Sequence, residues 1–240
     1  MKIKIGLLLC DHVPEGLLAS FGDYPEMYQR AFNGLGFQIS WIVYDACKTE
    51  LPNTTGEVDG FIISGSRYSV NDNEKWITSL ISFVSWLNQE KIPTVGICFG
   101  HQLIAKALGG VVEKSGSGWG VGCKTFLVDG KRDWMKGSKV ELVVPAFHQE
   151  QITRLPIGGR LLGSANYCTN FLMECNDQML GIQGHPEFRK EYISALLEER
   201  LAVLSDAVSS DAEKSLKLCA DNTLIKTWIL EFIRMRSQLL

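Results

Sequence analysis

The first hundred residues alternate short apolar runs, rich in β-branched side chains, with longer segments of helical period. The runs that predict strands are residues 3–9, 37–44, 60–63 and 93–97. Between them, residues 24–35 and 74–88 repeat apolar side chains every three or four positions, as amphipathic helices do. Strands that alternate with helices pair in parallel through crossover connections, so this rhythm predicts βαβ units.

After residue 110 the pattern changes to short apolar runs separated by Gly, Asn, Asp and Pro. These runs predict further strands over residues 126–128, 140–144, 161–162, 171–175 and 179–182. Residues 192–204 and 224–239 then predict helices, with a polar joint near residues 205–211 between them. The fold class that this order favours is α/β, with a mostly parallel central sheet flanked by helices and a helical tail.

Cysteine usage and charge limit the setting and the partners. The seven cysteines form no C-x-x-C pair, and the chain of 240 residues is far longer than disulfide-dense secreted domains, which favours a reduced, cytoplasmic setting. The apolar run at residues 5–10 is too short for a signal peptide or a membrane span. With 24 Lys and Arg against 27 Asp and Glu and no long run of like charge, neither nucleic acid nor a membrane is an expected partner.

Cys98 stands in the pentapeptide G-I-C-F-G, directly after the predicted strand 93–97 and directly before a helical stretch. This is the arrangement of a nucleophile elbow with sulfur in place of the hydroxyl. Gly96 and Gly100 occupy the two positions where a sharp strand-to-helix turn would crowd a Cβ. The N-terminal end of the helix would stabilise a thiolate and supply N–H groups to an oxyanion. The alternative is that Cys98 is a small buried apolar residue, the usual fate of a free cysteine.

A catalytic thiol needs a base, and the base needs an acceptor that orients it. Two histidines occupy the same pattern, H-Q-E at 148–150 and H-P-E at 185–187, and each follows an apolar strand. Spacing alone does not choose between them. His101 lies in the first turn of the elbow helix with no nearby carboxylate, which makes it a weaker candidate, and His12 is expected to be solvated.

Other site classes find little support in the sequence. No spacing of His and Cys matches a zinc signature, and no phosphate-loop or dinucleotide fingerprint occurs, so we expect no metal and no cofactor. Gly65 follows the predicted strand 60–63 and could offer a backbone N–H to an oxyanion, because glycine permits close approach of the main chain. An ordinary turn is the alternative there.

Three motifs taken together resemble the class I glutamine amidotransferase family: G-I-C-F-G-H-Q at 96–102, G-I-Q-G-H-P-E-F at 181–188 and F-I-I-S-G-S at 61–66. The resemblance extends over about residues 3–190. It implies a flavodoxin-like amidotransferase domain over residues 1–190, with residues 191–240 as a helical C-terminal extension packed on it. That extension is too short to be a synthetase.

The resemblance also implies a Cys-His-Glu triad, with Cys98 as the nucleophile, His185 as general base and acid, and Glu187 orienting the histidine. It favours His185 over His148, since residues 147–152 correspond to a substrate-side loop of the family. The other residues that it implies are the backbone N–H groups of Gly65 and Phe99 for the oxyanion hole, and Gln102, Ser66, His148, Trp119 and Gly120 for substrate binding.

The implied activity is hydrolysis of the side-chain amide of glutamine or a γ-glutamyl compound, through a γ-glutamyl thioester, by a protein that acts alone. In this the chain is similar to the glutaminase domain of GMP synthase and to the γ-glutamyl peptidases. The alternative is a glutaminase subunit that delivers ammonia to a separate synthetase, with the C-terminal helices as its docking surface. A non-catalytic relative that binds a ligand or a protein through the same pocket agrees less well with a complete triad.

Overall fold

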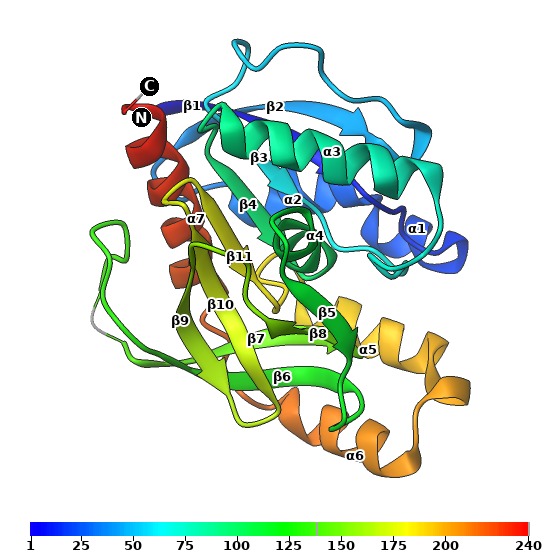
Figure 1. The fold of residues 1–240 in the computed structure, drawn as a ribbon. Helices are drawn as coiled ribbons and strands as arrows, with labels where there is room; N and C mark the ends of the chain where they lie inside the picture. The colour runs from blue at the N-terminus through cyan, green and yellow to red at the C-terminus, as the bar shows by residue number, and fades with distance from the viewer. Residues whose placement is uncertain (138, 240) are drawn as a thin grey trace.

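The computed structural model describes residues 1–137 and 139–239, and within them a mixed nine-stranded sheet runs through the molecule (Figure 1). Its strands are β1 (Lys2–Leu9), β2 (Gln38–Asp45), β3 (Gly60–Ile63), β4 (Thr94–Ile97), β6 (Gly120–Val128), β7 (Glu141–His148), β9 (Gly159–Ala165), β10 (Cys168–Cys175) and β11 (Met179–Ile182). A small antiparallel sheet is formed by β5 (Val111–Lys114) and β8 (Glu150–Arg154).

The strand order is β2-β1-β3-β4-β11-β10-β9-β6-β7. In this order the neighbours from β2 to β11 (β2, β1, β3, β4 and β11) pair in parallel. The neighbours from β11 to β7 (β11, β10, β9, β6 and β7) pair antiparallel. Each strand predicted from the sequence overlaps an observed one. The predicted fold class, an α/β protein with a mostly parallel sheet core, is therefore confirmed.

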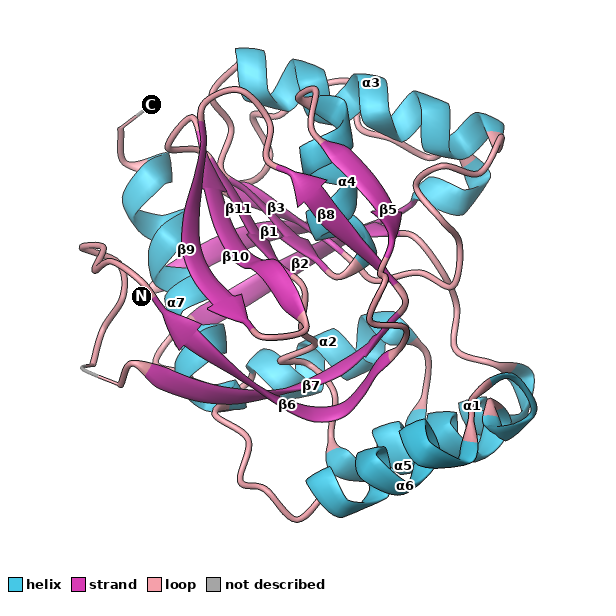
Figure 2. Cartoon of the chain, turned by 60° about the horizontal axis from the view of Figure 1, so that its bottom comes forward, coloured by secondary structure: helices cyan, strands magenta, loops and turns pink. Residues whose placement is uncertain are grey.

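Helices cover both faces of the parallel half (Figure 2). Over residues 1–137 and 139–239 the helices are α1 (Glu15–Phe21), α2 (Tyr24–Phe32), α3 (Lys75–Gln89), α4 (Phe99–Ala107), α5 (Lys190–Glu199), α6 (Asp206–Ser215) and α7 (Asn222–Ser237), with short 3-10 turns η1 (Ala46–Lys48) and η2 (Leu201–Val203). Helix α6 packs on β6, in the antiparallel half. The sheet has a buried apolar core on each face, and alternate residues of β1 belong to different cores. Leu7 packs with α2, α5 and α7, whereas Leu8 packs with α3 and α4. None of the helices in the described part of the chain is long and apolar enough to cross a membrane.

The sequence predicts a polar joint between two helices at residues 205–211. This prediction is wrong, because helix α6 begins at Asp206. Ser205 caps the helix by accepting a hydrogen bond from the Val208 amide. The helix buries Ala212 against β6, where Gly122 (φ +96°) brings the strand backbone close. A helix with so few apolar residues is difficult to recognise from apolar periodicity.

Helix α7 belongs to the main core. Its apolar residues Ile225, Trp228, Ile229 and Phe232 lie in the same buried cluster as strand β1 and helix α2. Helix α7 is therefore packed against β3 and β4 of the sheet. The expected division of the chain at residue 190 stays a prediction.

The turn from β4 into α4 depends on two glycines. A Cβ on Gly96 would lie 2.2 Å from the Gly100 carbonyl oxygen, and a Cβ on Gly100 would lie 2.5 Å from the Ile63 carbonyl oxygen. Both obstacles are backbone atoms, which cannot rotate away. Helix α4 therefore approaches β3 and β4 more closely than side chains at these positions would allow.

Substituting Gly100→Ala should destabilise the fold by about 1–3 kcal/mol, the usual cost of overpacking a core. The matched control is Gly116→Ala, at a position where nothing lies within 4 Å of the added Cβ. Urea unfolding followed by circular dichroism measures both variants. Equal free energies of unfolding for the two would contradict the close approach.

Candidate active site

Cys98 lies between β4 and α4 in a strained backbone conformation, with φ 51° and ψ −99°. A positive φ is rare for a residue with a side chain, and such strain persists where the surroundings fix it, often at functional sites. Here the Cys98 amide donates to the Ile182 carbonyl at 2.8 Å, which ties the turn to the end of β11. The residue is buried, with 5% exposed.

His185 reaches the same place because β11 pairs in parallel with β4, with Ile182 in register with Ile97. The residues after β11 therefore emerge beside those after β4. His185 Nδ1 lies 2.7 Å from Glu187 Oε1, and its ring stacks on Phe188 with centroids 4.1 Å apart. This contact gives the ring a fixed orientation, with Nδ1 toward the carboxylate.

The surroundings of His185 favour its charged form. Burial lowers the pKa of the imidazole, but the charge interactions with Cys98 and Glu187, and the hydrogen bonds to both, outweigh it and raise the pKa to about 10. The His185 ring thus lies between the Cys98 side chain and the Glu187 carboxylate and contacts both.

The other H-x-E segment, residues 148–150, makes different contacts. His148 Nδ1 lies 3.1 Å from the backbone carbonyl of Glu150, while the Glu150 carboxylate accepts from Ser69 Oγ at 2.6 Å. Burial lowers the pKa of His148 to about 3, so its ring is neutral at physiological pH. Residues 147–152 form the end of β7 and the start of β8 rather than the expected loop.

His101 is fully buried on the side of α4 that faces the sheet. Its Nε2 lies 2.9 Å from the Asn170 carbonyl oxygen, and a Cβ on Gly181 would lie 2.4 Å from its Nδ1. Burial lowers its pKa to about 4. The ring thus contacts β10 and β11, in keeping with its low rank among the candidate bases.

The two expected oxyanion donors have free amide groups. Phe99 is the first residue of α4, where no intrahelical acceptor exists, and within residues 1–137 and 139–239 the Gly65 amide has no hydrogen-bond acceptor. A Cβ on Gly65 would lie 2.7 Å from His185 Cε1. Glycine at this position makes room for the imidazole.

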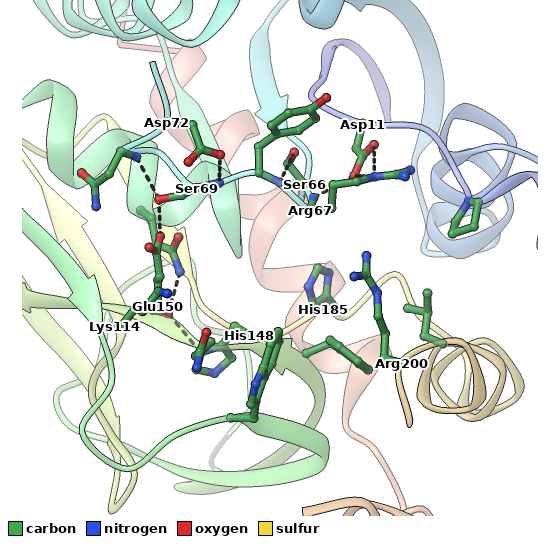
Figure 3. A pocket seen from close by; sticks show the side chains of 18 of the residues that line it. Asp11, Ser66, Arg67, Ser69, Asp72, Lys114, His148, Glu150, His185 and Arg200 are labelled. Atoms are coloured by element: carbon green, nitrogen blue, oxygen red, sulfur yellow. Dashed lines mark hydrogen bonds and ion pairs between the residues drawn. The ribbon is translucent and has the colours of Figure 1, made fainter. Parts of the chain in front are cut away.

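A cleft of about 490 Å³ opens beside His185 (Figure 3). Of the residues expected to bind substrate, those that line it are Ser66, Gln102, Trp119 and His148. Gly120 lies behind His148 as its partner in the β6–β7 ladder, and a Cβ there would lie 2.8 Å from His148 Nε2. Gln102 already donates from Nε2 to the Glu150 carbonyl at 2.8 Å, so its Oε1 is the atom available to a ligand.

Sequence reasoning missed two side chains that contact these residues. Gln183 is fully buried and donates from Nε2 to Cys98 Sγ at 3.5 Å. It lies in the same G-I-Q-G-H-P-E motif as His185, so its place in the motif was an available signal. Tyr28, on α2, donates to Glu187 Oε1 at 3.4 Å, and nothing in its local sequence indicates this contact.

No cluster of three side chains suited to a metal ion occurs in the described ranges.

The sequence and the fold can be compared with those of known proteins. A family model described as glutamine amidotransferase class-I matches residues 18–202. The chain is 28% identical to γ-glutamyl peptidase 3 of Arabidopsis thaliana over 223 residues, 89% of each protein. It is 31% identical to a subunit of the glutamine-hydrolysing GMP synthase of Sulfolobus acidocaldarius over 169 residues, 70% of this chain and 86% of the relative. The crystal structure of a glutamine amidotransferase from Thermotoga maritima superposes with a TM-score of 0.70 at 19% identity, covering 98% of this chain and 97% of that one.

The charge interaction with Cys98 predicts how His185 titrates. The imidazole should keep its proton through neutral pH and lose it as the pH rises toward 10, and in Cys98→Ala its pKa should fall. Nitrogen-15 NMR of the histidine rings, assigned with His→Gln variants, measures this. His101 and His148 serve as internal controls, because both should stay neutral from pH 6 upward. An unchanged pKa of His185 in Cys98→Ala would show that the two groups are not coupled.

Proposed function

This chain belongs to the class I glutamine amidotransferase family, and on that premise we propose that it hydrolyses the side-chain amide of glutamine or a γ-glutamyl compound through a thioester on Cys98. The observation that carries the proposal is the His185–Glu187 pair, with the Nδ1 to Oε1 distance of 2.7 Å, on the segment that emerges beside Cys98. The ring of the other H-x-E histidine has a backbone carbonyl as its partner in place of a carboxylate.

The proposed reaction has two halves. The Cys98 thiolate attacks the γ-carbonyl carbon, and the amide N–H groups of Gly65 and Phe99 stabilise the oxyanion. His185 gives its proton to the leaving nitrogen, so that ammonia or an amine departs and a γ-glutamyl thioester remains. A water molecule then gives one proton to His185 and attacks the thioester carbon, and the C–S bond breaks, which restores the Cys98 thiolate beside protonated His185 and releases the γ-carboxylic acid of glutamate, which loses its proton to solvent.

We propose that the γ-glutamyl end binds beside β5 and β8. Lys114 and Glu150 are partners in the β5–β8 ladder, and both line the cleft. A γ-glutamyl group ends in an ammonium and a carboxylate, so an acid and a base side by side are its complement. Ser66, Gln102, Trp119 and His148 complete the proposed contacts, with Gly120 supporting His148.

The second candidate is a glutaminase subunit that passes ammonia to a separate synthetase. The 31% identity to one subunit of an archaeal GMP synthase favours it. Ammonia release from this chain alone would then be weak until the partner binds. Both candidate functions need Cys98 as a free thiol. The proposal therefore includes a reducing, cytoplasmic compartment.

The two candidates make different predictions for the purified protein. Incubation with glutamine and with a panel of γ-glutamyl dipeptides should release glutamate from at least one dipeptide, and Cys98→Ala should release none. Glutamate is measured by a coupled dehydrogenase assay. Turnover that appears only when a cell extract is added would favour the role of a synthetase partner, and no turnover in either case would contradict both.

The choice of base can be tested by two matched substitutions. His185→Asn should abolish turnover, since it removes the proton carrier, with a loss of about 10²–10⁴-fold or more in kcat. His148→Asn should act mainly by raising KM, because that ring is neutral and lines the cleft. Steady-state kinetics on the best substrate separate the two effects. The reverse ranking would show that the wrong histidine was chosen.

The nucleophile can be identified without turnover. An electrophilic glutamine analogue should label Cys98 in a peptide map. Buried Cys123 and Cys175 serve as controls, because burial raises the pKa of both thiols. Labelling of either, with Cys98 untouched, would refute the assignment.

A further inference from the structure

The cleft beside His185 has two ends of different chemistry. In Figure 3, Lys114, Glu150 and His148 lie on one side of His185, and Asp11, Arg67 and Arg200 lie on the other. The first end is the one assigned above to the γ-glutamyl group. With the γ-glutamyl group at the first end and His185 giving its proton to the leaving nitrogen, as proposed above, the leaving group extends toward the second end.

Two arginines line the second end, and they differ in their partners. Arg67 is neutralised, since its Nε lies 2.9 Å from both carboxylate oxygens of Asp11. It also donates from its backbone amide to Asp11 Oδ2 at 2.7 Å. Arg200 has neither a hydrogen-bond nor an ion-pair partner for its guanidinium in the part of the chain that the structure describes. It is therefore the cation with unused donors at this end.

The backbone at Arg200 is fixed. The residue caps the C-terminal end of α5, and its backbone N–H donates hydrogen bonds to the Leu197 and Glu198 carbonyl oxygens. The neighbouring carboxylate of Glu199 faces α1: its Oε1 lies 3.3 Å from the position of a Cβ on Gly16. The end of α5 thus packs against the start of α1, and the acid nearest in sequence is directed away from the cleft.

Apolar and aromatic side chains line the same cleft as Arg200, together with Asp11 and Arg67. They are Pro14, Tyr24, Phe188 and Leu196, and Leu196 lies one helical turn before Arg200 on α5. An arginine among such side chains suits a ligand that carries a carboxylate and an apolar body, because guanidinium binds carboxylate through two parallel hydrogen bonds.

We propose that Arg200 binds the carboxylate of the leaving group, so that the preferred substrate is a γ-glutamyl amino acid or short peptide with a free C-terminal carboxylate and an apolar side chain. This inference rests on the function proposed above. Ammonia, the leaving group from glutamine, has no carboxylate for Arg200 to bind. A cleft of about 490 Å³ lies within the range of about 300–1,000 Å³ that holds larger ligands.

Binding to the inactive Cys98→Ala variant tests the inference apart from turnover. Calorimetry with γ-glutamyl-phenylalanine and with its C-terminal amide should show tighter binding of the free acid, by about 10- to 100-fold, the range for a hydrogen-bonded charge pair. Adding Arg200→Ala should bring the ratio of the two affinities close to one, and Arg200→Lys should restore part of it. The charge control is Lys217→Ala, an exposed cation outside the cleft, which should leave the ratio unchanged.

The same pair of substrates gives the kinetic test. The ratio of kcat/KM for the acid to that for the amide should fall in Arg200→Ala and persist in Lys217→Ala. Equal binding of acid and amide to the Cys98→Ala variant, or a ratio that does not change with Arg200→Ala, would overturn the role of Arg200. Normal discrimination in binding with no turnover of any γ-glutamyl compound by the unmodified protein would instead contradict the proposed function and leave the binding role of Arg200 supported.

Discussion

The parallel pairing of β4 with β11 is the contact on which the rest of the site depends. It sets Ile182 beside Ile97, and the Cys98 amide then donates to the Ile182 carbonyl. Two segments more than 80 residues apart in the chain thereby leave the sheet at the same edge. In open α/β sheets ligands bind at the carboxyl ends of the strands, because there the loops diverge and backbone amides are free. A slip of one residue in this register would turn the side chains of β11 to the opposite faces of the sheet.

The chemistry follows from what surrounds the two histidines of identical local pattern. Both are buried, and burial by itself disfavours the charged imidazole. At His185 a carboxylate and a thiol offset this cost, whereas at His148 the ring meets a backbone carbonyl. A buried charged group is tolerated when each of its partners is in place, and such a site is specific because removing one partner leaves the others unpaired.

The cleft also combines elements that are distant in sequence. Strands β5 and β8 bring Lys114 and Glu150 to one end, and the end of α5 brings Arg200 to the other. Helix α5 follows directly on the segment that carries His185 and Glu187, and Leu196 and Arg200 from this helix and its end line the cleft. The proposed role of Arg200 would connect specificity for the leaving group to the position of a helix that the sequence places outside the catalytic motifs.

Much of this could be predicted from the sequence, and the limits have physical reasons. The alternation of buried strands and amphipathic helices determined the fold class, and the glycines around Cys98 determined the turn, because both patterns express local geometry. Helix α6 escaped prediction, since it buries little apolar surface. The contacts of Gln183 and Tyr28, the difference between His148 and His185, and the place of Arg200 at the cleft were decided only by the tertiary structure. Each of these depends on which groups distant in sequence come within a few ångströms, and burial and charge act through those distances alone.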